Sequence, residues 1–210
     1  MTRGKFIALE GGEGAGKSTQ ARLLAEALRL RGIDVVTTRE PGGTPGAEAI
    51  RELLLTLEGE GWNPRAEALL FAAARSDHVE RLIQPALAQG QWVICDRFLD
   101  SSRAYQGGGG GLSDADLLEL HRIGSGGLLP DLTLLMEVPP AIAAERLAAR
   151  QAGDDRIEAK GAAYHARVGH AFVRFADSDP QRFARIQADG SREDTHAAIM
   201  TMLTPLLEGA

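Results

Sequence analysis

Hydrophobic positions along the chain follow two alternating patterns. A short apolar run at residues 6–9 ends in glycines, and apolar side chains then recur at helical spacing over residues 17–31, which predicts a strand, a loop and a helix. Further strands are predicted at residues 35–38, 92–95, 132–137 and 183–187, and further helices at residues 47–54, 64–87, 113–123, 141–150, 160–176 and 193–207. Five glycines at residues 107–111 predict a break, and residues 151–159 form a polar interval.

Five strands separated by helices predict right-handed crossovers and a mostly parallel sheet covered by helices on both faces, which is a three-layer α/β architecture. No repeat and no interdomain linker is visible, so we expect one domain over residues 1–210. Ligands of such sheets bind outside the carboxyl ends of the strands. The segments after Leu9, Thr38, Cys95 and Glu137 are therefore expected to converge on one cleft.

Composition narrows the functional class. Hydrophobic residues make up 44% and charged residues 25% of the chain, which is typical of a folded globular protein. The single cysteine, Cys95, excludes an internal disulfide framework and a cysteine-rich zinc site. The sequence shows no apolar run of membrane-spanning length and no secretory signal, and its net charge of -6 argues against a protein that coats nucleic acid or an anionic membrane. We therefore expect a cytoplasmic protein with no nucleic-acid or membrane partner.

The first predicted loop carries a phosphate-binding motif. Residues 11–18 read G-G-E-G-A-G-K-S and fit G-x-x-x-x-G-K-[ST] between a strand and a helix, a context that argues against a chance glycine-rich turn. In this motif backbone N–H groups bind phosphates, Lys17 reaches the β- and γ-phosphates, and the Ser18 hydroxyl is a ligand for Mg²⁺. The sequence thus predicts a P-loop NTPase fold that binds a nucleoside triphosphate. The expected phosphate-binding residues are Gly11, Gly12, Glu13, Gly14, Ala15, Gly16, Lys17, Ser18 and Thr19.

The rest of the chain separates the kinds of P-loop protein. GTP-binding switches read guanine with an Asn-Lys-x-Asp segment, whereas Asn63 is the only asparagine here and its neighbours do not fit. Motor-type ATPases usually end the metal-binding strand with an acidic pair, but this strand ends in Asp96 and Arg97, an acid followed by a base. Asp96 is expected to hold Mg²⁺ through water or to pair with Arg97, with a capping or loop role as the alternative. The arginine at this position favours a second bound phosphate.

Several motifs, taken in order, complete a known pattern. They are residues 9–19 (LEGGEGAGKST), 39–44 (REPGGT), 70–75 (LFAAAR), 96–98 (DRF), 104–107 (AYQG) and 155–158 (DRIE). Together they extend over nearly the whole chain, and the sequence resembles the thymidylate kinase family. The resemblance implies Mg²⁺-dependent transfer of the γ-phosphoryl group of ATP to dTMP, which gives dTDP and ADP in dTTP biosynthesis. It also implies a homodimer and a short mobile lid at about residues 148–160.

The resemblance also assigns an acceptor pocket. Arg39 and Arg97 each follow a predicted strand, where a guanidinium group could hold the acceptor phosphate, and a surface salt bridge is the alternative for each. By resemblance Phe71, otherwise a core residue, stacks on thymine, Arg75 hydrogen-bonds a base carbonyl oxygen, and Tyr105 packs where a ribose 2′-hydroxyl would project. The expected dTMP-binding residues are Glu13, Arg39, Pro41, Arg51, Phe71, Arg75, Arg97, Ser102, Tyr105 and Gln106.

Catalysis by such a kinase is mostly alignment and charge neutralisation, because a nucleoside monophosphate already carries an anionic oxygen. Gly14 occupies the place where some family members have an arginine, so the missing charge is expected from lid arginines, as in the bacterial subtype: Arg156 first, then Arg150. An exposed charged turn is the alternative for the lid. Glu13 is expected near the sugar 3′-hydroxyl, or else as a solvated loop charge. The expected catalytic residues are Lys17, Arg97, Arg156, Arg150 and Glu13, and the expected metal ligands are Ser18 and Asp96.

Two other functions fit parts of the pattern. A kinase for another nucleoside monophosphate or for a deoxynucleoside would share the phosphate loop, but a nucleoside kinase needs a carboxylate base, for which Glu40 is the only evident candidate near the cleft. A nucleotide-dependent switch would bind tightly and hydrolyse slowly, and the missing guanine motif counts against it. The histidines show no spacing typical of metal ligands and are expected to be structural or exposed: His78, His121, His165, His170 and His196.

Overall fold

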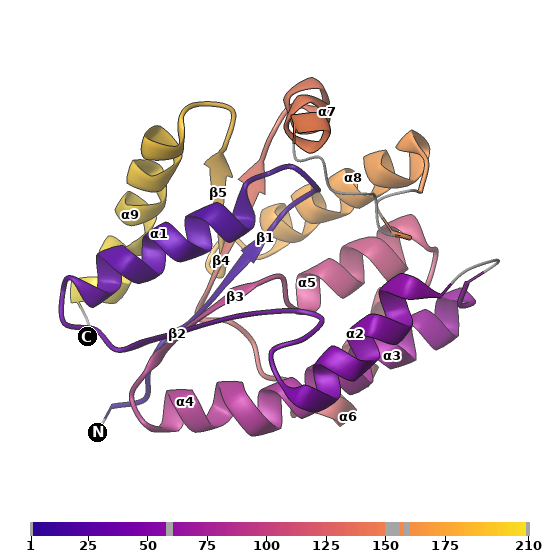
Figure 1. The fold of residues 1–210 in the computed structure, drawn as a ribbon, viewed down its shortest axis with the longest axis horizontal. Coiled ribbons are helices and arrows are strands. Elements are labelled where there is room, and N and C mark those ends of the chain that lie inside the picture. The colour runs from indigo at the N-terminus through magenta and orange to yellow at the C-terminus, as the bar shows by residue number, and fades with distance from the viewer. Residues whose placement is uncertain (1, 58–60, 150–155, 158–159, 209–210) are drawn as a thin grey trace.

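The sheet is fully parallel and has five strands. The computed structural model describes residues 2–57, 61–149, 156–157 and 160–208. The strand order is β2-β3-β1-β4-β5, and every neighbouring pair is parallel. Figure 1 shows the sheet between layers of helices, so the predicted three-layer α/β architecture is confirmed. The strands are β1 (Phe6–Glu10), β2 (Val35–Arg39), β3 (Trp92–Asp96), β4 (Leu132–Glu137) and β5 (Phe183–Gln187).

Strand β1 lies at the centre of the sheet, and its side chains alternate between two buried layers. Ile7 and Leu9 belong to the core that contains α1 and α9, whereas Phe6 and Ala8 pack with the helices on the opposite face. Burial on both faces explains why the central strands β1, β3 and β4 are nearly continuous apolar runs, whereas the edge strands β2 and β5 are partly exposed. No described helix is both long and apolar enough to cross a membrane. The α-helices are α1 (Lys17–Arg29), α2 (Pro45–Thr56), α3 (Pro64–His78), α4 (Gln84–Ala88), α5 (Leu99–Ser102), α6 (Asp114–Ser125), α7 (Pro140–Ala149), α8 (Ala162–Ser178) and α9 (Arg192–Glu208).

The glycine run does not break the chain where the sequence predicts. Helix α5 continues into a π-helical segment, η2 (Arg103–Gly109), which includes the first three glycines of the run. The reason is the close approach of α8. A Cβ atom on Gly108 would lie 2.5 Å from the Cβ atom of Ala171, and a Cβ atom on Gly109 would lie 2.5 Å from the Tyr164 ring. The glycines therefore allow two helical segments to touch.

The helix predicted over residues 64–87 is also interrupted. The chain stays helical, but a π-helical segment, η1 (Val79–Ile83), separates α3 from α4. Pro85 accounts for this, because it lacks an N–H group and its ring would clash with the Arg81 carbonyl group in an unbroken α-helix. Most other predicted boundaries agree with the structure to within a few residues.

Candidate active site

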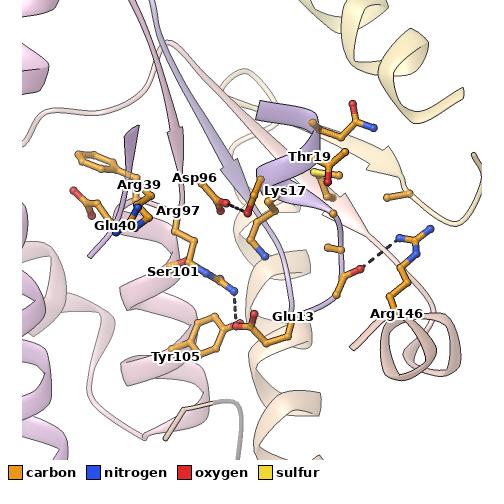
Figure 2. A pocket seen from close by; sticks show the side chains of 18 of the residues that line it. Glu13, Lys17, Thr19, Arg39, Glu40, Asp96, Arg97, Ser101, Tyr105 and Arg146 are labelled. Carbon is orange, nitrogen blue, oxygen red and sulfur yellow. Dashed lines mark hydrogen bonds and ion pairs between the residues drawn. The ribbon is translucent and has the colours of Figure 1, made fainter. Parts of the chain in front are cut away.

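A cavity lies at the carboxyl edge of the sheet, where the sequence predicts the ligand site. Its volume is about 900 Å³, and the loops after β1, β2 and β3 line it together with parts of α3, η2 and α9 (Figure 2). Gly11, Gly12 and Arg156 do not line it, although the structure describes them. The predicted residues that line it are Glu13, Gly14, Ala15, Gly16, Lys17, Ser18, Thr19, Arg39, Pro41, Arg51, Phe71, Arg75, Asp96, Arg97, Ser102, Tyr105 and Gln106.

The phosphate loop depends on backbone conformations that favour glycine. Gly11, Gly14 and Gly16 have φ angles of 136°, 71° and 87°. A Cβ atom on Gly11 would lie 2.4 Å from the Met136 carbonyl oxygen, and one on Gly14 would lie 2.7 Å from the Ala143 carbonyl oxygen. Helix α1 follows directly and has no side-chain cap at its N-terminus. The N–H groups of its first turn are thus left for an anion, as the motif predicts.

Lys17 bends back over this loop. Its Nζ atom donates to the carbonyl oxygens of Gly12 at 2.7 Å and of Gly11 at 3.2 Å. Burial of the side chain, together with the nearby Arg97 guanidinium, lowers the pKa of Lys17 to about 8. Bound phosphates would raise this pKa again, because their negative charge favours the ammonium form. The position fits the polyphosphate role that the sequence predicts.

The two predicted metal ligands lie side by side. Ser18 Oγ donates to Asp96 Oδ2 at 2.5 Å and so joins the start of α1 to the end of β3. Hydroxyl and carboxylate oxygens are ligands of the kind that Mg²⁺ prefers. Within the described part of the chain, no group of three or more histidine, cysteine or acidic side chains could hold a metal ion. An ion at this pair would complete its shell with phosphate and water oxygens.

Arg97 reaches from the end of β3 to the phosphate loop. Its Nη1 atom donates to the Gly11 carbonyl oxygen and to Ser101 Oγ, each at 3.1 Å, and its Nη2 atom forms an ion pair with Glu13. The φ angle of Arg97 is 69°, a left-handed conformation that costs free energy in a residue with a side chain. The contacts of the Arg97 side chain hold its backbone in this unfavourable conformation, and such strained residues are common at functional sites.

Tyr105 completes this cluster from η2. Its hydroxyl group donates to Glu13 Oε1 at 3.0 Å, and its ring centre lies 5.0 Å from Arg97 Cζ. Burial raises the pKa of Tyr105, so the phenol keeps its proton and remains a donor. Figure 2 shows Glu13, Arg97 and Tyr105 grouped beside Lys17. The structure thus brings the predicted acceptor residues next to the predicted donor site.

The predicted base pocket is built around a buried arginine. Arg75 Nη2 donates to Ser102 Oγ at 2.9 Å and to the Phe98 carbonyl oxygen at 3.1 Å. Phe71 lies one helical turn earlier on α3, is half-buried and lines the same cavity. Gln106 lines it from η2. An aromatic ring, a guanidinium group and an amide therefore border a space suited to a planar base.

Arg39 and Arg51 line the cavity at a more exposed edge. Arg39 Nη2 donates to both carboxylate oxygens of Glu48 at 3.0 Å, and the Arg39 side chain is 54% exposed. Arg51 Nη1 donates to the Pro41 carbonyl oxygen at 2.9 Å. Arg39 therefore forms the salt bridge that the sequence allows as its alternative, and its role as a phosphate ligand stays a prediction.

Known proteins are similar to this chain in sequence and in fold. The family model described as thymidylate kinase matches residues 9–199. The chain is 58% identical to the thymidylate kinase of Rhizorhabdus wittichii over 205 residues, which are 97% of this chain and 99% of that protein. It is 48% identical to that of Caulobacter vibrioides over 207 residues, 99% of each chain. The chain belongs to the thymidylate kinase family.

The structural comparison agrees with this family. The crystal structure of thymidylate kinase from Ehrlichia chaffeensis has a TM-score of 0.78 and 31% identity, and the match covers 96% of this chain and 100% of that chain. The predicted P-loop NTPase fold is therefore confirmed. The predicted enzyme class, a nucleoside monophosphate kinase, is confirmed by membership of the thymidylate kinase family.

In the predicted lid, the Arg156 side chain is held by α2 and α3, whereas its neighbour Ile157 lines the cavity. Arg156 Nη2 forms an ion pair with Glu67 on α3, and Arg156 Nε donates to the Leu54 carbonyl oxygen at 3.2 Å. Arg150 falls outside the described residues. The catalytic roles of Arg156 and Arg150 therefore stay predictions.

The charged residues Arg146, at the cavity, and Glu10, behind it, belong to no predicted set. Arg146 on α7 lines the cavity, and its Nη1 atom donates to the Gly14 carbonyl oxygen at 3.4 Å. Its only signal in the sequence is its place on the helix that leads to the predicted lid. Glu10 ends β1 and accepts hydrogen bonds from the backbone N–H groups of Phe98 at 2.8 Å and Ser101 at 3.0 Å. Burial raises the pKa of Glu10 to about 7, and an acid at the end of an apolar strand is its signal.

Tyr105→Ala is expected to weaken discrimination against ribonucleotides, because it removes the ring that Glu13 and Arg97 hold in place. The ratio of kcat/KM for dTMP to that for ribothymidine 5′-monophosphate should fall about tenfold. Steady-state rates with each acceptor measure this ratio. Tyr105→Phe keeps the ring and should keep the ratio. If the ratio is unchanged in Tyr105→Ala, the proposed role of Tyr105 at the sugar is wrong, but the kinase activity itself is not called into question.

Proposed function

We propose that the enzyme transfers the γ-phosphoryl group of ATP to dTMP and forms dTDP and ADP, a step of dTTP biosynthesis. One observation carries this proposal: the phosphate loop with Lys17 faces the cluster of Arg97, Glu13 and Tyr105 within one cavity. A triphosphate donor fits the first group, and a nucleoside monophosphate fits the second. Identity of 58% to a thymidylate kinase supports the same pair of substrates.

Alignment of two anions is the task for which these residues are suited. The acceptor phosphate supplies an anionic oxygen, so no protein base is needed to form the nucleophile. Arg97 binds the acceptor phosphate, and Lys17 binds the β- and γ-phosphates, which reduces the repulsion between the two substrates. Glu13 orients Arg97 through their ion pair and lies toward the sugar. Arg156 supplies further positive charge once it leaves Glu67, with Arg150 as the second lid arginine.

Mg²⁺ fits the donor side of this site. Ser18 Oγ and Asp96 Oδ2, which lie 2.5 Å apart, would hold the ion at the end of β3. When bound, Mg²⁺ would neutralise part of the charge on the phosphates. Asp96 and Ser18 contribute by fixing the ion relative to the phosphate loop.

A nucleoside kinase is the rival that shares most of this site. The carboxylate base that the sequence offers for such a kinase is Glu40, but both Glu40 oxygens are engaged. Oε2 accepts from Arg75 Nε at 2.7 Å, and Oε1 lies 3.0 Å from His78 Nδ1. The Glu40 side chain is also buried. A carboxylate held in this way is poorly placed to remove a proton from a hydroxyl group, which favours an acceptor that is already anionic.

The deciding experiment measures ADP formation with Mg²⁺-ATP and one acceptor at a time. The acceptors are dTMP, dUMP, UMP, CMP, AMP, GMP and thymidine, with a control that contains none. We expect dTMP to give the highest kcat/KM and thymidine to give no turnover above the control. Another leading acceptor would overturn the base-pocket assignment. Equal ADP formation without acceptor would indicate an ATPase or a switch.

We further propose a cytoplasmic homodimer. Leu53 on α2, Leu57 just after it and Leu69 on α3 are large apolar side chains with exposures of 51%, 41% and 56%. Helices α2 and α3 pack against each other, so these side chains lie on neighbouring elements. Large exposed apolar side chains on and beside two packed helices support a contact between two copies of the chain. The free, buried Cys95 fits a reducing compartment.

A further inference from the structure

A buried series of hydrogen bonds connects Arg75, the arginine of the base pocket, to strand β2. Arg75 Nε donates to Glu40 Oε2 at 2.7 Å. The other oxygen, Glu40 Oε1, lies 3.0 Å from His78 Nδ1, and His78 Nε2 lies 2.7 Å from Thr38 Oγ1. His78 is fully buried, and Glu40 and Arg75 are nearly so. This relay of Thr38, His78, Glu40 and Arg75 runs from β2 to the cavity wall.

The relay fixes most of the Arg75 guanidinium group. A guanidinium has five N–H donors. Three of them are used here: Nε binds Glu40, and the two hydrogens of Nη2 serve Ser102 Oγ and the Phe98 carbonyl oxygen. Among the described residues none accepts a hydrogen bond from Nη1, so this atom is left for a ligand in the cavity. Because the group is planar, fixing Nε and Nη2 also fixes the direction of the Nη1 donors.

His78 in turn fixes the carboxylate. A carboxylate only accepts hydrogen bonds, so Nδ1 is the donor, and this bond sets the orientation of the imidazole ring. With Oε1 held by His78 and Oε2 held by Arg75, the Glu40 carboxylate has no freedom to rotate. The Glu40 N–H group donates to the Asp96 carbonyl oxygen at 3.0 Å, which anchors the backbone of Glu40 to β3.

The loop after β2 closes over the imidazole. A Cβ atom on Gly43 would lie 2.6 Å from His78 Nε2 and 2.4 Å from Thr38 Oγ1, so no larger residue fits there. The hydrogen bond between Thr38 and His78 is therefore shielded from water, and the buried side chains of Glu40 and Arg75 continue the relay to the cavity. Polar networks in such surroundings are stronger and more rigid than exposed ones, provided that their members are paired.

We propose that Glu40 and His78 are positioning residues that aim Arg75 Nη1 at the acceptor base and thereby set the base preference. This inference rests on the proposed dTMP kinase function. A fixed donor accepts a base with a carbonyl oxygen at the facing position, as in thymine, and rejects a base with an amino group there, as in cytosine, because two donors would then face each other. If the relay is broken, Arg75 gains freedom and this discrimination weakens.

His78→Gln tests the relay. The variant should raise the dissociation constant and the KM for dTMP about tenfold, with kcat and the KM for ATP within about twofold of wild type. The preference for dTMP over dCMP in calorimetric binding should fall about tenfold. If His78→Gln does not fold, Thr38→Val removes only the far hydroxyl group and should show the same pattern with a smaller change.

His121→Gln is the matched control. His121 is a second buried histidine whose Nε2 atom lies 2.7 Å from the Leu128 carbonyl oxygen and whose ring meets the Phe98 ring edge-on at 5.7 Å. The substitution therefore removes a buried imidazole near the same pocket without breaking a hydrogen bond of the relay. It should leave dTMP affinity and base preference unchanged. A folded His78→Gln enzyme with unchanged dTMP affinity and base preference would overturn the relay, as would equal changes in the KM values for ATP and dTMP. A wild-type enzyme that fails to phosphorylate dTMP would instead overturn the proposed function.

Discussion

Lys17→Ala is expected to lower kcat/KM by about 10³-fold or more while the protein stays folded. The ammonium group lies within the phosphate loop, where it would act on the charge that moves during transfer. Burial removes water from the ammonium group in the free enzyme, and this loss of hydration lowers the pKa of Lys17 to about 8. Its removal should therefore not lower the free energy of unfolding. Initial rates of ADP formation and denaturant unfolding measure the two effects.

Lys5→Ala is the matched control for this variant. Lys5 precedes β1 and does not line the cavity, so its loss should change neither turnover nor substrate affinity. A folded Lys17→Ala enzyme with turnover within about tenfold of wild type would contradict the role assigned to the loop. A variant that unfolds at lower denaturant would instead show that Lys17 contributes to stability.

The parts of the fold that sequence predicts well are those with a local cause. The central strands β1, β3 and β4 are apolar runs because both faces of the sheet are buried there, so hydrophobicity alone locates them. The edge strands β2 and β5 are partly exposed and carry polar residues, so their hydrophobic signal is weaker. The glycine run at residues 107–111 shows the limit of this approach. Glycine commonly marks a break, but here it serves the contact of η2 with α8, which follows much later in the chain. The contact between η2 and α8 cannot be predicted from the sequence around the glycines.

The residues of the site also fall into two groups, those that local sequence predicts and those that depend on contacts between distant elements. The positions of Lys17 and Ser18 follow from the fixed spacing of one motif, and Arg97 follows from its place after a strand. The partner of Arg39 depends on how α2 returns to β2, which no spacing indicates. His78 likewise meets Glu40 from a distant helix, and a histidine without a paired ligand has no functional signature in the sequence. Contacts between elements must be seen in the structure.

Arg97→Ala is expected to lower kcat/KM for dTMP by about 10³-fold, through both a higher KM for dTMP and a lower kcat. The guanidinium joins the acceptor cluster to the phosphate loop, so its loss removes both the expected ligand of the acceptor phosphate and the ion-pair partner of Glu13. Initial rates at varied dTMP and saturating Mg²⁺-ATP separate the two parameters. Calorimetric titration with dTMP gives the affinity directly.

Two further variants separate the side chain from the backbone at this position. Arg97→Gly removes the guanidinium but relieves the left-handed backbone, whose φ is 69°, so it should be more stable than Arg97→Ala and equally impaired. Arg97→Lys keeps a positive charge but lacks the planar pair of donors. Its kcat/KM for dTMP should therefore be at most about tenfold higher than that of Arg97→Ala. Near-complete recovery by Arg97→Lys would mean that charge alone is required. Activity in Arg97→Gly well above that of Arg97→Ala would place the defect in the strained backbone, because both variants lack the guanidinium.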